Sequence, residues 1–258
     1  MKHTYSSQSH CLQRAPFWQK MMLILLVTLL LTALPVFTQL QAAYLSDPQP
    51  QVRMAGHLWQ RQALDFERAS IAFDNKDYDY SAQLLQPLAQ QGHVQAQYLL
   101  ATLYDVGLGV VKNEKKSFYW YKQAARAGIV VAQHNLAVAY ARGNGVAASL
   151  PKAIVWWKRA ALAGNTDSQY NLGIIYASGH DSIKPDLKQA LKWWRMAAIN
   201  GDAMAQFNLG ALYASGFDKR NHTCEASRWW KKSAASGLKR AQLALALLQS
   251  QQEYAVCR

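Results

Sequence analysis

The chain has 258 residues, of which 51% are hydrophobic and 17% are charged. This composition excludes an intrinsically disordered chain, because it supplies enough apolar surface for a continuous core. The formal net charge is +13, and so basic a balance is typical of proteins that meet acidic polymers or anionic membrane surfaces. A solvated basic surface without a specific anionic partner is the commoner interpretation.

Residues 1–43 have the pattern of a secretory signal peptide. Lys2, Arg14 and Lys20 precede an apolar stretch from Met21 to Phe37, and small residues follow it. A basic start, an apolar middle and a small-residue end predict cleavage after Ala42. The alternative is an uncleaved anchor in the inner membrane, formed by residues 21–37, although a span usually needs about 20 residues.

Both interpretations carry the rest of the chain across the membrane, so we expect a periplasmic or secreted protein. Removal of residues 1–43 takes away three basic residues and no acid, and the formal charge falls from +13 to +10. An anionic envelope polymer is therefore a candidate partner. Nucleic acid is not expected for an exported chain, and membrane contact is expected only through an uncleaved anchor.

Two segments precede the main part of the chain. Residues 44–64, with Pro48 and Pro50, are expected to form a leader and an amino-terminal helix. Residues 65–94 have the features of a degenerate capping repeat, because Gly92 lies 36 residues before Gly128 and Leu84 takes the place of a tryptophan found in later units.

Four full units follow, over residues 95–130, 131–166, 167–203 and 204–240. Each contains an aromatic pair, then two small residues, then a glycine. The pairs are Trp120-Tyr121, Trp156-Trp157, Trp193-Trp194 and Trp229-Trp230. The first tryptophan advances by 36, 37 and 36 residues, and a fixed period of this size predicts an array of helical repeats.

A second pattern precedes each aromatic pair. In the first unit it consists of Ala96, Leu100 and Tyr104, followed by Gly107. Small, leucine and tyrosine residues at spacings of four lie on one face of a helix, and the glycine ends it. Each unit is therefore predicted to be two helices with the aromatic pair in the core. The alternative, an exposed aromatic platform that stacks on sugars, fits the helical spacing less well.

These motifs resemble the Sel-one-like repeat family, a relative of the tetratricopeptide repeats, over about residues 65–250. The resemblance implies an all-α fold, an α/α superhelix (solenoid) of paired antiparallel helices that acts as a scaffold for protein complexes and not as an enzyme. Bacterial members are often exported. Asp181 and Asp218 depart from the family pattern, which has a loop glycine at each of these places.

The resemblance also implies that the first helices line a concave face that binds a protein partner. The expected contact residues vary between units, and they are Tyr98, His134, Tyr170 and Phe207, with Arg142. A ladder of Asn135, Asn171 and Asn208 is a further candidate, since an amide both donates and accepts hydrogen bonds. The alternative is that these asparagines tie adjacent hairpins together. Gln97, Gln133, Gln169 and Gln206 form a parallel ladder with the same two interpretations.

Residues 241–258 are expected to form a carboxy-terminal capping helix and tail. Cys224 and Cys257 are the only cysteines after the signal peptide, and in an oxidising compartment they are predicted to form a disulfide. Two free thiols are the alternative.

The histidines are scattered and no catalytic or metal-binding motif is present in the sequence, so we expect neither an enzyme nor a cofactor. The main functional hypothesis is an exported scaffold for protein complexes in the bacterial envelope. The alternative is a periplasmic regulator that binds the sensor domain of a membrane signalling protein. An envelope hydrolase is a third hypothesis that no residue set supports.

Overall fold

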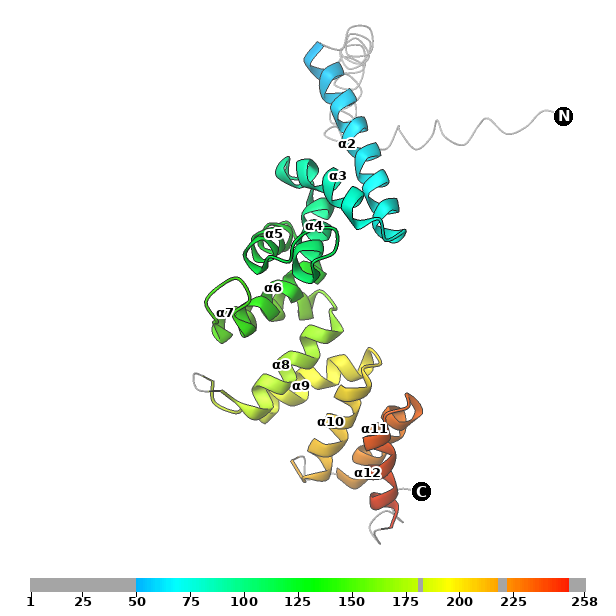
Figure 1. Ribbon diagram of the computed structural model, residues 1–258. Coiled ribbons are helices and arrows are strands. Elements are labelled where there is room, and N and C mark those ends of the chain that lie inside the picture. Colours follow the sequence, from blue (N-terminus) through cyan, green and yellow to red (C-terminus); the bar gives the residue numbers. More distant parts are fainter. Residues whose placement is uncertain (1–49, 181–182, 218–221, 251–258) are drawn as a thin grey trace, which may run out of the picture. The chain divides into compact units, whose positions relative to one another are not determined.

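The computed structural model describes residues 50–180, 183–217 and 222–250. The signal peptide, Asp181, Asp218 and Cys257 lie outside these ranges. The chain divides into two compact units, Met1–Ala63 and Leu64–Arg258, and the four full repeats lie in the second. The described residues form eleven helices and no β-strand (Figure 1).

Each full repeat consists of a first and a second helix, nearly all of 13 residues. The first helices are α4 (Val94–Val106), α6 (Val130–Arg142), α8 (Thr166–Ser178) and α10 (Ala203–Ala214). The second helices are α5 (Glu114–Arg126), α7 (Leu150–Leu162), α9 (Leu187–Ile199) and α11 (His222–Ala235). Before them come α2 (Pro50–Asp74) and α3 (Tyr78–Gln90), and after them comes α12 (Lys239–Gln249). From α3 to α12, each helix packs against the helices before and after it in the chain, which confirms the predicted all-α repeat fold.

Polar side chains fix where many of these helices begin. Asn113, Asn165, Asp186 and Asp202 each accept a hydrogen bond from the backbone N–H three residues further on. These bonds satisfy donors that have no partner within the helix. In α4 the same role falls to His93, whose Nδ1 accepts from the N–H of Ala96 at 3.2 Å.

The aromatic pairs form much of the core, as predicted, but their two members differ. The second member is buried in every repeat: Tyr121, Trp157, Trp194 and Trp230. The first member is buried in the last two repeats, as Trp193 and Trp229, and only half-buried in the first two, as Trp120 and Trp156. Fully buried alanines such as Ala124 and Ala160 let neighbouring helices approach closely.

Two helical glycines make room for indole rings. A Cβ added to Gly173 in α8 would overlap the ring of Trp194, and one added to Gly210 in α10 would overlap the ring of Trp230. Each indole therefore packs directly on the backbone of the first helix of its own repeat. The Nε1 of Trp230 uses this closeness to donate a hydrogen bond to the carbonyl oxygen of Phe207, at 3.0 Å.

The glutamine ladder ties consecutive repeats together. The side-chain amide of each of its four glutamines donates to the carbonyl oxygen of the residue eight positions earlier, near the end of the preceding second helix. The donor–acceptor distances are 3.1 Å from Gln97 to Ala89, 3.2 Å from Gln133 to Ala125, 2.9 Å from Gln169 to Ala161 and 3.0 Å from Gln206 to Ala198. Of the two interpretations of this ladder, the structure supports the one that joins adjacent hairpins.

In the first two repeats, the loop between the paired helices also rests on the preceding helix pair. Gly145 has a φ of +70°, and an added Cβ would overlap the carbonyl of Glu114 at the start of α5. Only a residue without a Cβ fits so close to another backbone. The two later repeats carry Asp181 and Asp218 at the equivalent position, outside the described residues.

Candidate partner-binding surfaces

The predicted contact residues occupy one equivalent position on the four first helices. We call Tyr98, His134, Tyr170 and Phe207 the first-helix row, and all four side chains are half-buried. The Tyr98 ring lies 6.2 Å from the ring of Tyr121, and the Phe207 ring lies 6.3 Å from the ring of Trp230. One part of each side chain thus supports the core, and the rest is open to solvent.

His134 also connects two repeats. Its Nδ1 lies 2.8 Å from the hydroxyl of Ser168 in α8, a buried side chain. Burial lowers the pKa of His134 below its ordinary value, against a smaller opposing effect of Asp167. The contact with Ser168 of the next repeat therefore holds the His134 ring in place. Replacing His134 would change both the first-helix row and the contact between the second and third repeats.

The asparagine ladder stands beside the first-helix row and is half-buried. Asn135 lies near Tyr121, whose hydroxyl is 3.3 Å from Thr102 Oγ1. Burial raises the pKa of Tyr121 to about 12. This contact joins α6 to α5 and favours the structural interpretation for Asn135. Asn171 and Asn208 hold the equivalent places on α8 and α10.

Two further predicted residues lie away from this row. Arg142 is exposed at the last position of α6, next to Gly143. Cys224 lies near the start of α11 and takes part in a disulfide. Because Cys257 lies outside the described residues, the pairing of these two cysteines stays a prediction.

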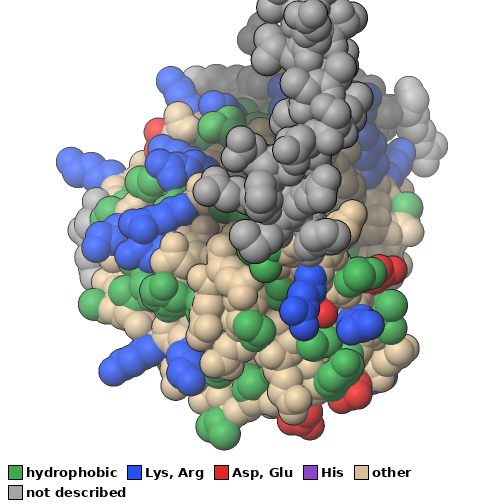
Figure 2. All heavy atoms as spheres, turned by 90° about the horizontal axis from the view of Figure 1, so that it is seen from above, with side chains coloured by type: hydrophobic (Ala, Val, Ile, Leu, Met, Phe, Trp, Pro, Cys, Tyr) green, Lys and Arg blue, Asp and Glu red, His purple; other side chains and the backbone are tan. Residues whose placement is uncertain are grey.

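The second helices carry a surface that the sequence analysis did not single out. Together α5, α7, α9 and α11 contain thirteen lysines and arginines and two glutamates. The first helices α4, α6, α8 and α10 contain one arginine and two aspartates. The face of the molecule seen in Figure 2 accordingly shows many Lys and Arg side chains and few Asp and Glu. Positive charge is thus concentrated on one helix of each pair.

A sequence signal for this surface exists. The residue two positions after the first tryptophan of each pair is basic in all four repeats, as Lys122, Lys158, Arg195 and Lys231. Each of these cations is easily taken for an ordinary solvated residue, and only their recurrence at one repeat position indicates a shared surface.

Many of the lysines and arginines on the second helices lie over aromatic rings. Lys116 Nζ is 4.8 Å from the centre of the Tyr104 ring, Lys158 Nζ is 5.5 Å from that of Tyr176, and Lys232 Nζ is 4.6 Å from that of Trp229. A cation over a ring face is stabilised by about 0.5–1 kcal/mol at an exposed site. The aromatic residues of the repeat therefore hold part of the basic surface in place.

Two hollows occur at equivalent places between consecutive second helices. The Tyr104 groove, between α3 and α5, has a volume of about 320 Å³ and includes Gln86, Lys116 and Trp120. The Tyr213 groove, between α9 and α11, has a volume of about 400 Å³ and includes Arg195, Arg228 and Trp229. In each, the tyrosine of a first helix and the first tryptophan of an aromatic pair contribute to the lining, and cations flank them. The repeat geometry thus produces a recurring groove whose chemistry differs from unit to unit.

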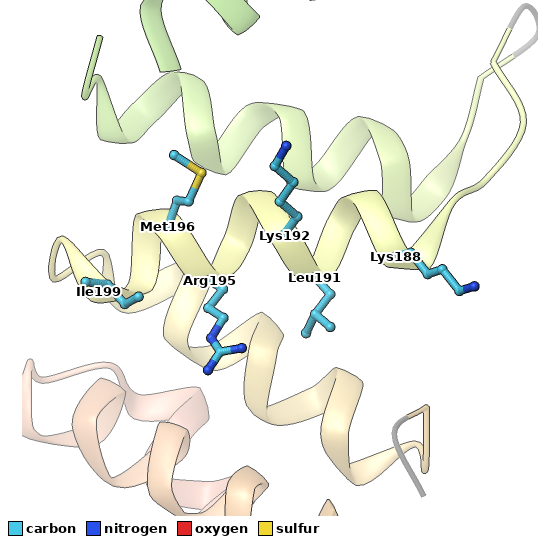
Figure 3. A pocket seen from close by; sticks show the side chains of 6 residues that line it. All are labelled: Lys188, Leu191, Lys192, Arg195, Met196 and Ile199. Carbon is cyan, nitrogen blue, oxygen red and sulfur yellow. The ribbon is translucent and has the colours of Figure 1, made fainter. Parts of the chain in front are cut away.

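A third hollow lies along α9 itself. We call it the α9 hollow; its volume is about 450 Å³, and its lining residues are Lys188, Leu191, Lys192, Arg195, Met196 and Ile199 (Figure 3). It adjoins the Tyr213 groove, because Arg195 and Ile199 line both.

Neither metal-binding nor membrane-spanning features occur in the part of the chain that the structure describes. No group of three His, Cys, Asp or Glu side chains there is placed to hold a metal ion. Within the same ranges, no helix is both long enough and apolar enough to cross a bilayer.

Comparison with known proteins identifies the repeats. The family model for the Sel1 repeat matches four consecutive segments, residues 94–129, 130–165, 166–202 and 203–238, which together make up more than half of the chain. The chain is a Sel1 repeat protein. These boundaries lie within about two residues of the units expected from the sequence. Sel1 repeats are generally non-catalytic scaffolds that bind other proteins.

Solved structures agree with this assignment. A Sel1 repeat protein from Oxalobacter formigenes is 30% identical, with a TM-score of 0.65, over 70% of this chain and 72% of that one. A protective antigen of uropathogenic Escherichia coli with an SLR fold is 35% identical, with a TM-score of 0.62, over 66% of this chain. This chain spans only 37% of the length of that antigen. No curated protein matches the chain.

Proposed function

We propose that this Sel1 repeat protein is an exported scaffold of the bacterial envelope that binds a protein partner through the first-helix row. The observation that carries the proposal is the row itself. Four stacked repeats each present one half-buried side chain at the same position, and the residue type changes from repeat to repeat. A constant backbone with variable contacts is what a specific, extended protein interface requires.

Export is the first testable part of this proposal. Its support is the basic, acid-free start of the chain, the apolar stretch from Met21 to Phe37 and the alanines that follow. We expect the protein in the periplasmic or secreted fraction to begin at about residue 43, which amino-terminal sequencing checks. A chain that still begins at Met1 and stays in the membrane would show that residues 21–37 act as an anchor.

The partner is best sought by site-specific crosslinking in intact cells. We expect a photoreactive phenylalanine analogue at Tyr170 to capture a partner, because this ring is half-buried and accepts another aromatic group with little change to the core. Tyr119 on α5 is the matched control, since it is an exposed tyrosine on a second helix.

The pattern of crosslinks distinguishes the hypotheses. Capture at Tyr170 and not at Tyr119 supports the first-helix row. Capture of several proteins supports a scaffold, whereas capture of one membrane signalling protein supports the regulator hypothesis. Capture at Tyr119 alone would place the partner on the second helices and contradict the row.

A further inference from the structure

We infer that the α9 hollow and the Tyr213 groove together bind an acidic segment of a partner protein, with an aliphatic side chain of that segment seated in the hollow. This inference rests on the proposed scaffold function and adds a second, chemically defined docking site to it. The site lies on second helices, apart from the first-helix row.

The exposed side of α9 combines cations with apolar side chains. Its residues follow the helical spacing i, i+3, i+4 and i+7, so they share one side of the helix, opposite the buried Trp193 and Trp194. In Figure 3, Lys192 and Met196 extend to one side of the helix axis, and Leu191 and Arg195 extend to the other. Ile199 ends this stripe and is 69% exposed. We call Leu191, Met196 and Ile199 the apolar floor of the hollow, and each side of the helix axis also carries a positive charge, Lys192 or Arg195.

Most of the cations of the site lack an acidic partner. In the described ranges Lys188, Lys192 and Arg195 form no ion pair, and Lys192 Nζ lies 5.1 Å from the centre of the Trp193 ring. The Tyr213 groove adds Lys232 and Arg228 and a single acid, Glu225, which lies 3.6 Å from Arg228. The two hollows therefore form one surface with a large excess of positive charge, and Arg195 stands at their junction.

The combination of charge and apolar contact selects the occupant. An acidic glycan or a polyphosphate would pair with the cations, but it would leave Ile199 and the apolar floor of the α9 hollow in water. A flat lipid surface would not fill two adjoining hollows. A protein segment with carboxylates and an aliphatic residue matches both features, because burial of the aliphatic group and charge pairing each contribute to affinity.

The first repeat lacks the aliphatic part of this chemistry. In α5, the positions of Leu191, Met196 and Ile199 are held by Phe118, Gln123 and Arg126. The first repeat therefore keeps the basic residue at the place of Arg195, as Lys122, without the aliphatic floor. It provides a control within the same chain.

The test uses the purified full-length mature protein and a dye-labelled synthetic peptide in which glutamates flank two leucines. We expect binding, measured by fluorescence anisotropy, to weaken about tenfold or more in Arg195→Glu. Ile199→Ser, which removes apolar contact without changing the charge, should also weaken it. Lys122→Glu, the same charge reversal at the equivalent place in α5, should leave the peptide affinity unchanged, and circular dichroism should show all three variants folded.

Competing probes decide the class of ligand. The same peptide with serines in place of the leucines should bind at least several-fold more weakly, since the aliphatic contact is lost. Equal binding of that peptide, or equally tight binding of polyphosphate, would overturn the inference in favour of a general polyanion surface. Binding to vesicles with anionic lipid but not to the leucine-containing peptide would overturn it in favour of a membrane surface. Unchanged peptide affinity in Arg195→Glu would overturn the location.

The scaffold proposal is judged separately. Crosslinking from Tyr170 in cells that carry Arg195→Glu reports on the first-helix row alone. Loss of peptide binding with retained capture at Tyr170 supports both sites as distinct surfaces. Peptide binding to wild-type protein without any capture at Tyr170 supports the α9 site and contradicts the row.

Discussion

Single polar residues cap the helices and join the repeats, and two histidines with these roles make the stability of the array depend on pH. His93 accepts a backbone hydrogen bond through an unprotonated ring nitrogen at the start of α4, and burial lowers its pKa. His134, joined to Ser168, has its pKa lowered by the same cause. For both rings the neutral form is favoured in the folded protein.

The first prediction follows from the sign of these shifts. Because the folded-state pKa values lie below the ordinary value of 6.5, the unfolded chain takes up protons first as the pH falls through that value. The free energy of unfolding should therefore decrease below about pH 6.5 and be unaffected by these rings well above it. His93→Asn should keep the helix cap and make the pH dependence shallower, as measured by urea unfolding at about pH 7.5 and pH 5.5. An identical slope in the variant would contradict the role of His93.

For single residues, the sequence was enough to recognise the glutamine and asparagine ladders. It did not show whether their side chains face a partner or join adjacent hairpins. The recurrence of Gln169 and Asn171 was evident, yet a partner surface and a joint between hairpins were both consistent with it. The choice depends on how close the end of one helix comes to the side of the next. That distance arises from packing of the whole repeat and is not encoded in any local pattern.

Helices were the most predictable elements, because small residues, aromatic pairs and stop glycines recur at fixed spacings. What the spacing could not show was the unequal burial within the aromatic pairs of the first two repeats, where only the second member is buried. The second member contacts the backbone of the first helix, where α8 and α10 have Gly173 and Gly210 and the earlier repeats have Ala101 and Ala137. The spacing also did not show that the basic residues of the second helices form one surface, since each cation alone resembles any solvated residue.

The second prediction concerns the pairing of Gly173 with Trp194. Gly173→Ala should lower the free energy of unfolding by about 1–3 kcal/mol, because the new Cβ overlaps the indole and the buried ring must move. Adding Trp194→Tyr should recover part of the loss, since the first repeat combines Ala101 with Tyr121. Denaturant unfolding of the two single variants and the double variant measures the coupling. Additive losses would show that the two positions do not compete for the same space.

For the molecule as a whole, each helix from α3 to α12 is stabilised by its neighbours in the chain. Stability in such an array is approximately a sum of repeat and neighbour terms. Loss of one core side chain should therefore be felt first in adjoining repeats.

The third prediction compares two tryptophans at the same repeat position. Trp193→Ala should cost about 3–5 kcal/mol, because a buried indole is replaced by a cavity. Trp156→Ala should cost about 1–2 kcal/mol, since that ring is only half-buried and lies under Arg159 at 4.5 Å. Hydrogen exchange should show faster amide exchange in α8 and α10 for the first variant. Similar losses for both would contradict the difference in burial.

The glutamine bonds between repeats affect how such a chain can lengthen. Every bond joins residues eight positions apart across a repeat boundary, so each whole repeat carries the donor of one joint near its start and the acceptor of the next joint near its end. Insertion of a second copy of residues 130–165 before the original would bring the copied Gln133 against the end of α5, and the original Gln133 against the similar alanine-rich end of the copied α7. Duplication in register thus adds a complete joint with each new unit, whereas an insertion between the two partners of a bond would separate the carbonyl from its donor. Selection acting on this bond alone would favour growth by whole repeats.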